Sequence, residues 1–192
     1  MKKYLIIFAM LLCIGYAEAQ LIKSKAGIDP KYLTETAVPE VNGKVVFSRS
    51  IAIANGIDHD QAYQKVMSWV SQFYNRQEVL SRKDNGSANP TVRIAINEYL
   101  TFKKAFFNLD RTQLIYCLDI KVNGNALEVK MYDIKYYYDE DREGKHLTAE
   151  EQITDRNAVN KKRNGFYKGY GKFRTGTIDT FEHICTSLEK AL

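Results

Sequence analysis

The chain has 192 residues, of which 28 are lysine or arginine and 23 are aspartate or glutamate, giving a formal net charge of +5 at pH 7. This surplus is mild for the length and falls far short of the basic excess typical of proteins that bind nucleic acid. A chain of this size forms one domain with its own core, and its 3 prolines argue against a disordered or repeat-built chain.

The first predicted element is an export signal at residues 1–19. Two lysines precede an apolar run at 4–16, and a small-x-small triplet at 17–19 marks the expected cleavage point. As a helix the run would be about 20 Å long against about 30 Å of hydrocarbon, too short to span a bilayer. Bulky leucines before Cys13 disfavour a lipid anchor. We therefore expect an exported protein without stable membrane insertion, in a compartment poor in ATP, reduced nicotinamide cofactors and chromosomal DNA.

The segment after the signal, 20–42, is polar and without sustained periodicity, and it predicts a linker or an extended arm before a single domain at 43–192. A strand is predicted over 44–54, where β-branched and aromatic residues alternate with polar ones. A helix is predicted over 58–74, because an aspartate N-cap with glutamine three residues later precedes apolar residues at helical spacing.

Four further strands are predicted after this helix, with no helix between them. Polar turns separate the strands, and the Asn-Gly-Asn sequence at 123–125 is typical of a tight hairpin. Consecutive strands joined by short turns pair antiparallel, so we expect a meander. The predicted strands span 78–83, 91–103, 113–122 and 126–138.

The two middle strands of this meander carry their apolar residues at one parity, which predicts one covered sheet face and one face in contact with solvent. In the last strand the parity changes, indicating a β-bulge near Asp133. The solvent face presents mixed charges and hydrogen-bonding side chains, and it is the candidate ligand-binding surface. The candidate ligand-binding residues on it are Arg93, Asn97, Tyr99, Lys103, Asp119 and Lys121.

A charged, glycine-containing segment at 139–174 is predicted to be a long loop. Within it, a capping box formed by a threonine and a glutamate predicts a short helix near residue 148, and a final helix is predicted from about Thr177. A group rich in tyrosine accompanies the loop; it either forms a binding surface or packs the loop onto the end of the sheet. The candidate interaction residues are Tyr138, Phe166, Tyr167 and Tyr170.

The predicted order of strand, helix, four strands, loop and helix indicates an α+β fold, a five-stranded antiparallel sheet with both helices on one face. The opening stretch 38–47 (VPEVNGKVVF), followed by the helix with Trp69, and the closing stretches 147–151, 171–174 and 177–179 carry a family pattern. In these stretches the chain resembles the family called domain of unknown function 4468. The resemblance implies a fold like one half of the TATA-box-binding protein (TBP), an export signal and a Gram-negative bacterial source. That family has no established activity, so the resemblance supplies no catalytic residues.

The residue patterns predict no metal site, cofactor or catalytic constellation. The 3 histidines are not spaced as helical or hairpin metal ligands, and the acidic residues at 139–143 fit a solvated loop better than a calcium site. No serine lies in a nucleophile elbow, and no glycine-rich loop suits a phosphate.

The two cysteines of the expected mature chain, Cys117 and Cys185, are predicted to stay unpaired. Cys117 lies at a solvent-face position, whereas Cys185 lies on the apolar stripe of a helix packed on the opposite face. A disulfide requires Cα atoms within about 7 Å of each other.

These features favour a non-enzymatic binding or interaction module, periplasmic, secreted or on the cell surface. Its expected partner is a protein, peptide or glycan of the cell envelope, bound by the open sheet face or the long loop. The alternative is a hydrolase-type enzyme with a diffuse carboxylate and tyrosine site, for which Asp119, Glu128 and Asp133 are candidates. Nucleic-acid binding rests on fold analogy alone, and export argues against it.

Overall fold

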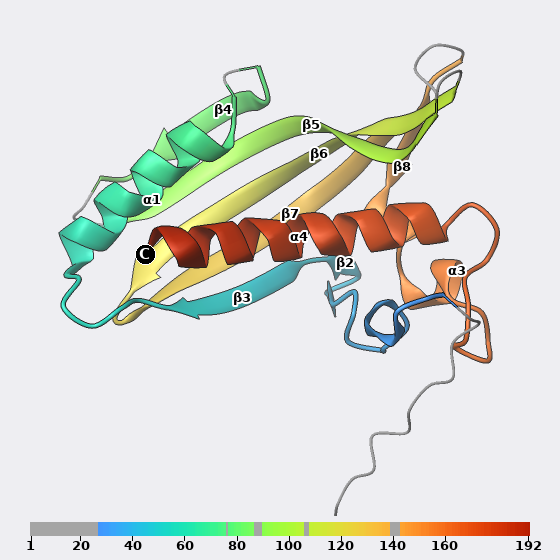
Figure 1. The fold of residues 1–192 in the computed structure, drawn as a ribbon, viewed down its shortest axis with the longest axis horizontal. Coiled ribbons are helices and arrows are strands. Elements are labelled where there is room, and N and C mark those ends of the chain that lie inside the picture. Colours follow the sequence, from blue (N-terminus) through green and yellow to red (C-terminus); the bar gives the residue numbers. More distant parts are fainter. Residues whose placement is uncertain (1–26, 76, 87–89, 106–107, 139–142) are drawn as a thin grey trace, which may run out of the picture.

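The computed structural model describes residues 27–75, 77–86, 90–105, 108–138 and 143–192. Its main feature is a strongly twisted antiparallel sheet (Figure 1). The strands are β3 (Phe47–Ala52), β4 (Val79–Asp84), β5 (Thr91–Ala105), β6 (Asn108–Asn123), β7 (Ala126–Tyr138) and β8 (Lys145–Thr148). They run in the order β3-β7-β6-β5-β4, and β8 pairs with the second half of β7.

Two long helices, α1 (His59–Phe73) and α4 (Gly171–Ala191), cover one face of this sheet (Figure 1). No helix in the described part of the chain is long and apolar enough to cross a membrane. The sheet and helix arrangement confirms the predicted α+β class. The smaller elements are η1 (Pro30–Tyr32), the hairpin β1 (Glu40–Val41) and β2 (Lys44–Val45), α2 (Ala149–Gln152) and α3 (Asp155–Ala158).

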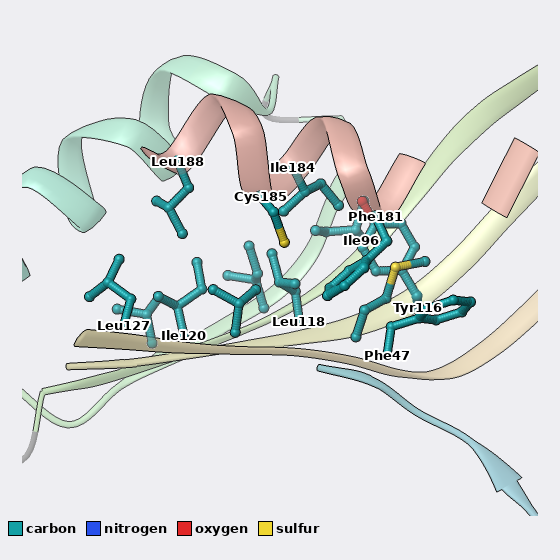
Figure 2. Packing of buried hydrophobic residues seen from close by; sticks show 14 of the residues in the cluster. Phe47, Ile96, Tyr116, Leu118, Ile120, Leu127, Phe181, Ile184, Cys185 and Leu188 are labelled. Atoms are coloured by element: carbon teal, nitrogen blue, oxygen red, sulfur yellow. The ribbon is translucent and has the colours of Figure 1, made fainter. Parts of the chain in front are cut away.

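The core lies between α4 and the sheet, and strand alternation explains its composition. Leu118 and Ile120 of β6 point toward α4, where Cys185 and Leu188 meet them (Figure 2). The predicted parity of β5 and β6 is confirmed, since their even-numbered apolar residues are buried or, in the case of Leu100 and Phe102, partly buried against the core. α1 joins this core through Trp69, whose Nε1 donates to Ser187 Oγ of α4 at 3.0 Å.

The bulge predicted near Asp133 is confirmed. Asp133 has a positive φ of 54°, and the register between β6 and β7 shifts where Ile115 and Cys117 face β7. The extra residue lets Met131 and Ile134 both enter the core although their positions differ in parity. β7 therefore keeps one covered face along its whole length.

The prediction of five strands is wrong, because in the described residues the main sheet has six and β1 and β2 form a separate hairpin. The predicted first strand is divided at Val46, and the supposed loop 139–174 contains β8, α2, α3 and the start of α4. The capping box of α2, between Thr148 and Glu151, is confirmed. β8 is short and opens with Lys145 and His146, so no apolar alternation marks it.

Helix α4 begins at Gly171, well before the predicted start at Thr177. Gly171 and Gly176 are poor helix formers, which hides the first turns from a propensity argument. Their role is close packing: a Cβ on Gly171 would stand 2.5 Å from the Phe166 ring, and one on Gly176 would stand 2.8 Å from a Leu100 methyl.

The N-terminal arm, residues 27–42, is docked on the helix side of the domain. Leu33 is fully buried, and Lys31 Nζ lies 2.9 Å from Asp179 and 2.7 Å from Glu182 on α4. The described arm therefore forms part of the folded unit and leaves the opposite sheet face uncovered.

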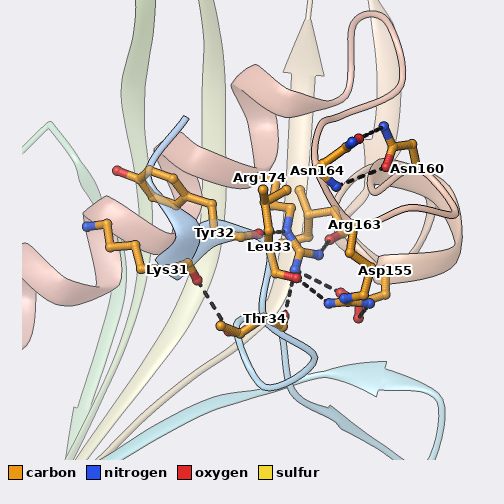
Figure 3. A network of polar contacts seen from close by, with 10 residues as sticks. Lys31, Tyr32, Leu33, Thr34, Asp155, Asn160, Arg163, Asn164 and Arg174 are labelled. Carbon is orange, nitrogen blue, oxygen red and sulfur yellow. Dashed lines mark hydrogen bonds and ion pairs between the residues drawn. The ribbon is translucent and has the colours of Figure 1, made fainter. Parts of the chain in front are cut away.

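A pair of arginines and one aspartate, here called the arginine clasp (Arg163, Arg174 and Asp155), fixes this arm (Figure 3). Arg174 is completely buried, and its Nε donates to Tyr32 O at 2.7 Å while Nη1 donates to Ile153 O at 2.6 Å. Asp155 lies 2.8 Å from Arg174 in an ion pair without hydrogen-bond alignment and accepts from Arg163 at 2.7 Å. The clasp thus joins the arm, the segment after α2 and the start of α4.

Candidate functional site

The open face is the side of the sheet opposite α1 and α4, and strand register arranges its side chains in rows. In the described part of the chain no helix packs on it (Figure 1). One row crosses every strand of the main path, with neighbouring strands about 4.8 Å apart. From edge to edge this row is Lys83, Arg93, Asp119, Lys130 and Ser48.

Arg93, Asp119 and Tyr132 form a hydrogen-bonded group in the middle of the open face. Arg93 Nε and Nη2 donate to the two oxygens of Asp119 at 2.7 and 2.5 Å, and the Tyr132 hydroxyl donates to the same carboxylate at 3.2 Å. Asp119 raises the pKa of Arg93, while burial, followed by the Asp119 charge, raises the pKa of Tyr132 to about 12. The Asp119 carboxylate therefore already accepts hydrogen bonds from Arg93 and Tyr132, and it fixes the orientation of both side chains.

Three exposed lysines surround this group. Lys83, Lys121 and Lys130 come from β4, β6 and β7, and within the described residues none of their side chains makes a hydrogen bond or an ion pair. Glu128, the register neighbour of Lys121, accepts a hydrogen bond from Asn123 at 2.6 Å. The three lysines outnumber Glu128, so this part of the open face carries net positive charge beside tyrosine and amide groups, a combination that attracts acidic groups.

The remaining predicted residues of the open face also have neighbours within the sheet. Asn97 Nδ2 donates to Gln113 Oε1 at 3.0 Å, and the Arg111 guanidinium stands 3.9 Å from the centre of the Tyr99 ring. Tyr99 is nevertheless 49% exposed, so its ring edge remains available for contact.

Lys103 does not belong to the row arrangement of the open face. A bulge between Thr101 and Lys103 shifts the register, so that Lys103 pairs with Asp110. The Asp110 carboxylate contacts Lys172 of α4 at 2.9 Å, on the helix side. Strict alternation predicts that Lys103 lies on the same sheet face as Arg93, and this prediction fails because of the bulge.

The four aromatic residues of the predicted interaction loop have different roles. The Tyr138 hydroxyl accepts from Lys172 at 2.7 Å, and Phe166 packs against the first turn of α4. Tyr170 is the N-cap residue of α4 and is half-buried, whereas Tyr167 is 42% exposed. Packing accounts for most of this group, and Tyr167 alone among the four is exposed.

The carboxylates considered for an enzyme each have a separate partner. Asp119 is bound by Arg93, Glu128 by Asn123, and Asp133 lies 3.0 Å from Lys135. Among the residues that the structure describes, no group of three histidine, cysteine, aspartate or glutamate side chains could hold a metal ion.

A second candidate site, which the sequence argument missed, lies on the helix side around Glu98. Glu98 is half-buried beneath α4, and Tyr116 donates to its Oε1 at 2.7 Å. Burial is the main reason why the pKa of Glu98 is raised, and the Tyr116 hydrogen bond opposes it. One sequence signal could have revealed this site. Glu98 is a charged residue at a core-facing position of its strand, where the alternate residues Val92, Ile94, Ile96 and Leu100 are apolar.

Within the residues that the structure describes, Cys117 and Cys185 are free, and their different surroundings predict different reactivity toward a thiol reagent. Burial raises the pKa of Cys185 to about 11, and burial together with Asp133 raises the pKa of Cys117. Because the thiolate is the reactive form, we expect slow labelling of Cys117 near pH 7 that accelerates as the pH rises above 9. Cys185 should react only in denaturant.

Ellman's reagent, applied to the native and the urea-unfolded protein, measures this difference. The expected result is labelling of Cys117 before unfolding and of Cys185 after it. Equal rates for the two thiols in the native state would contradict their placement on opposite faces.

Comparison with known proteins finds a family model that matches the central part of this chain. Residues 47–137 match the model of the family described as "Domain of unknown function (DUF4468) with TBP-like fold". A DUF4468 family protein from Bacteroides ovatus has a solved structure that is 29% identical, with a TM-score of 0.76 over 85% of this chain and 94% of that one. A TBP-like protein from Parabacteroides distasonis is 20% identical and shares the fold, with a TM-score of 0.67 over 81% of this chain and 96% of that one. No curated protein matches the chain.

Proposed function

We propose that this protein is an exported binding module. Residues 47–137 match the model of the DUF4468 family with its TBP-like fold, and that family has no assigned activity. The open face binds a protein, peptide or glycan of the cell envelope that carries acidic groups. The predicted export signal supports the location, and it argues against nucleic acid as the partner.

The observation that carries the proposal is the row of charges across the open face. Arg93 and Asp119 neutralise each other, and Lys83, Lys121 and Lys130 outnumber Glu128, so the net charge around the pair is positive. Ordered tyrosine and amide side chains between the lysines add hydrogen-bonding capacity at low entropic cost. A sheet face of this kind suits a flat, acidic partner surface rather than a small molecule.

Charge reversal of the three lysines tests this proposal. We expect the variant Lys83→Glu, Lys121→Glu and Lys130→Glu to lose at least about 90% of the envelope material that the parent protein captures, because like charges now oppose the partner. Capture is measured by affinity pull-down from envelope extract at low and high salt, with mass spectrometry and sugar analysis of the eluate. The parent's capture should weaken as salt rises.

A matched control has the same change in charge away from the open face: Lys65→Glu on α1, Lys161→Glu after α3 and Lys190→Glu on α4, all at exposed positions. This control should capture as the parent does. Treating the extract with protease then separates a polypeptide partner, which is lost, from a glycan, which is retained. Equal loss in both triple variants would refute the role of the open face.

A further inference from the structure

A pocket of about 360 Å³ opens on the helix side of the sheet, between α4, the end of α1 and β5. It is separate from the open face, because Glu98 and Leu100 lie on the covered side of β5. Phe73, Leu100 and Ile184 contribute apolar walls. Glu98, Asp179 and His183 contribute polar groups to the lining.

Glu98 is held in one orientation by two tyrosines. The Tyr116 hydroxyl donates to Glu98 Oε1 at 2.7 Å, and the Tyr74 hydroxyl lies 3.1 Å from that of Tyr116. Since the single proton of Tyr116 is used by Glu98, Tyr74 donates to Tyr116. Glu98 Oε2 has no hydrogen bond within the described residues, although each carboxylate oxygen can accept two. The pocket therefore contains a preorganised carboxylate with unused acceptor capacity.

The charges around Glu98 favour a positive occupant. The charge of Glu78 disfavours the ionised form of Glu98, and His183 favours it. Lys31 is already engaged by Asp179 and Glu182, at 2.9 and 2.7 Å. A cation placed beside Oε2 would meet a partly desolvated carboxylate, where attraction is stronger than in bulk water. Phe73 supplies an aromatic wall, against which organic cations also bind.

We propose that this pocket binds an organic cation, a primary ammonium or guanidinium group on an apolar chain, with Glu98 as its charged acceptor. The apolar chain lies against Phe73, Leu100 and Ile184, and the cation reaches Glu98 Oε2. The volume is near the lower end of ligand pockets, which span about 300–1,000 Å³, and suits a small amine or one basic side chain. This site shares no residue with the open-face row, so it stands or falls independently of the proposed function.

Two probes of nearly equal shape test the proposal by NMR on the ¹⁵N-labelled protein. N-acetyl-lysine methyl ester carries the ammonium group, and N-acetyl-norleucine methyl ester has a similar apolar chain without it. We expect the lysine probe to shift the amide signals of Gly176 and Thr180 in α4 and to bind about tenfold or more tightly than the norleucine probe. The variant Glu98→Gln should lose this preference.

The matched control is Glu128→Gln, which removes one carboxylate from the opposite sheet face and should bind the lysine probe as the parent does. Equal binding of the two probes to the parent protein would overturn the proposal, and so would an unchanged preference in a folded Glu98→Gln variant. If that variant fails to fold, the comparison of the two probes on the parent protein still decides the question.

Discussion

Replacing Arg174 by methionine is expected to lower the free energy of unfolding by about 3–5 kcal/mol, because the substitution breaks a buried ion pair and leaves two backbone carbonyl groups without their hydrogen-bond donor. Arg174 is 0% exposed and donates to the backbone of Tyr32 and Ile153. Its loss frees these carbonyl groups and leaves Asp155 with Arg163. Single domains are commonly stable by only about 5–15 kcal/mol, so the loss is a large part of the total.

Urea unfolding followed by the fluorescence of Trp69, the single tryptophan, measures this loss. The matched control is Arg156→Met, in the same region: Arg156 lies 3.8 Å from Glu40 and its side chain is 65% exposed. The control should cost about 0.5 kcal/mol or less, as exposed ion pairs do. Limited proteolysis should also cut residues 27–38 faster in Arg174→Met. Similar stability losses for both variants would show that the clasp does not hold the arm.

Truncating Leu118 to alanine is expected to cost about 2–5 kcal/mol, the range found when a buried leucine side chain leaves a cavity. Leu118 is 0% exposed and lies beneath Cys185 and α4 (Figure 2). The same urea titration measures the change. It tests the assignment of the covered face directly, because neighbouring positions on β6 face opposite ways.

Ile115→Ala on the same strand is the control for this prediction. Ile115 lies on the open face and is half-buried, so its truncation should cost about 1 kcal/mol or less. A larger loss for Ile115→Ala than for Leu118→Ala would mean that the parity of β6 is inverted. The proposed open face would then be part of the core.

The sequence predicts the parts of the fold whose periodicity is strong. β7 matches the predicted range 126–138, and α1 follows its capping box at Asp58 and Gln61. These elements are specified locally, by alternation, capping and tight turns. β8 and α3 are not, because they are short and polar and depend on pairing with β7 and on the arginine clasp. β8 is held by its pairing with β7, and α3 by the ion pair between Asp155 and the distant Arg174.

The candidate site was likewise predictable only where local strand alternation determines it. Parity alone brings Arg93, Asp119 and Lys121 to one face, as the structure confirms. The sequence pattern does not predict Lys130 on this face, because the bulge at Asp133 obscures the parity of β7. The Glu98 pocket depends on where α4 crosses β5 and on the glycine that permits the approach, and strand periodicity carries no information about either.

Cys117 offers a direct measurement of the central claim, that the open face is the binding surface. It lies opposite Tyr132 in the register of that face, next to the Arg93–Asp119 pair. We predict that envelope extract slows thiol labelling of Cys117 at pH 9 in the parent protein and leaves it unchanged in the Lys83, Lys121 and Lys130 charge-reversal variant. Labelling of Cys117 at the same rate with and without extract, while the partner is captured, would contradict the claim and place the binding surface elsewhere on the molecule.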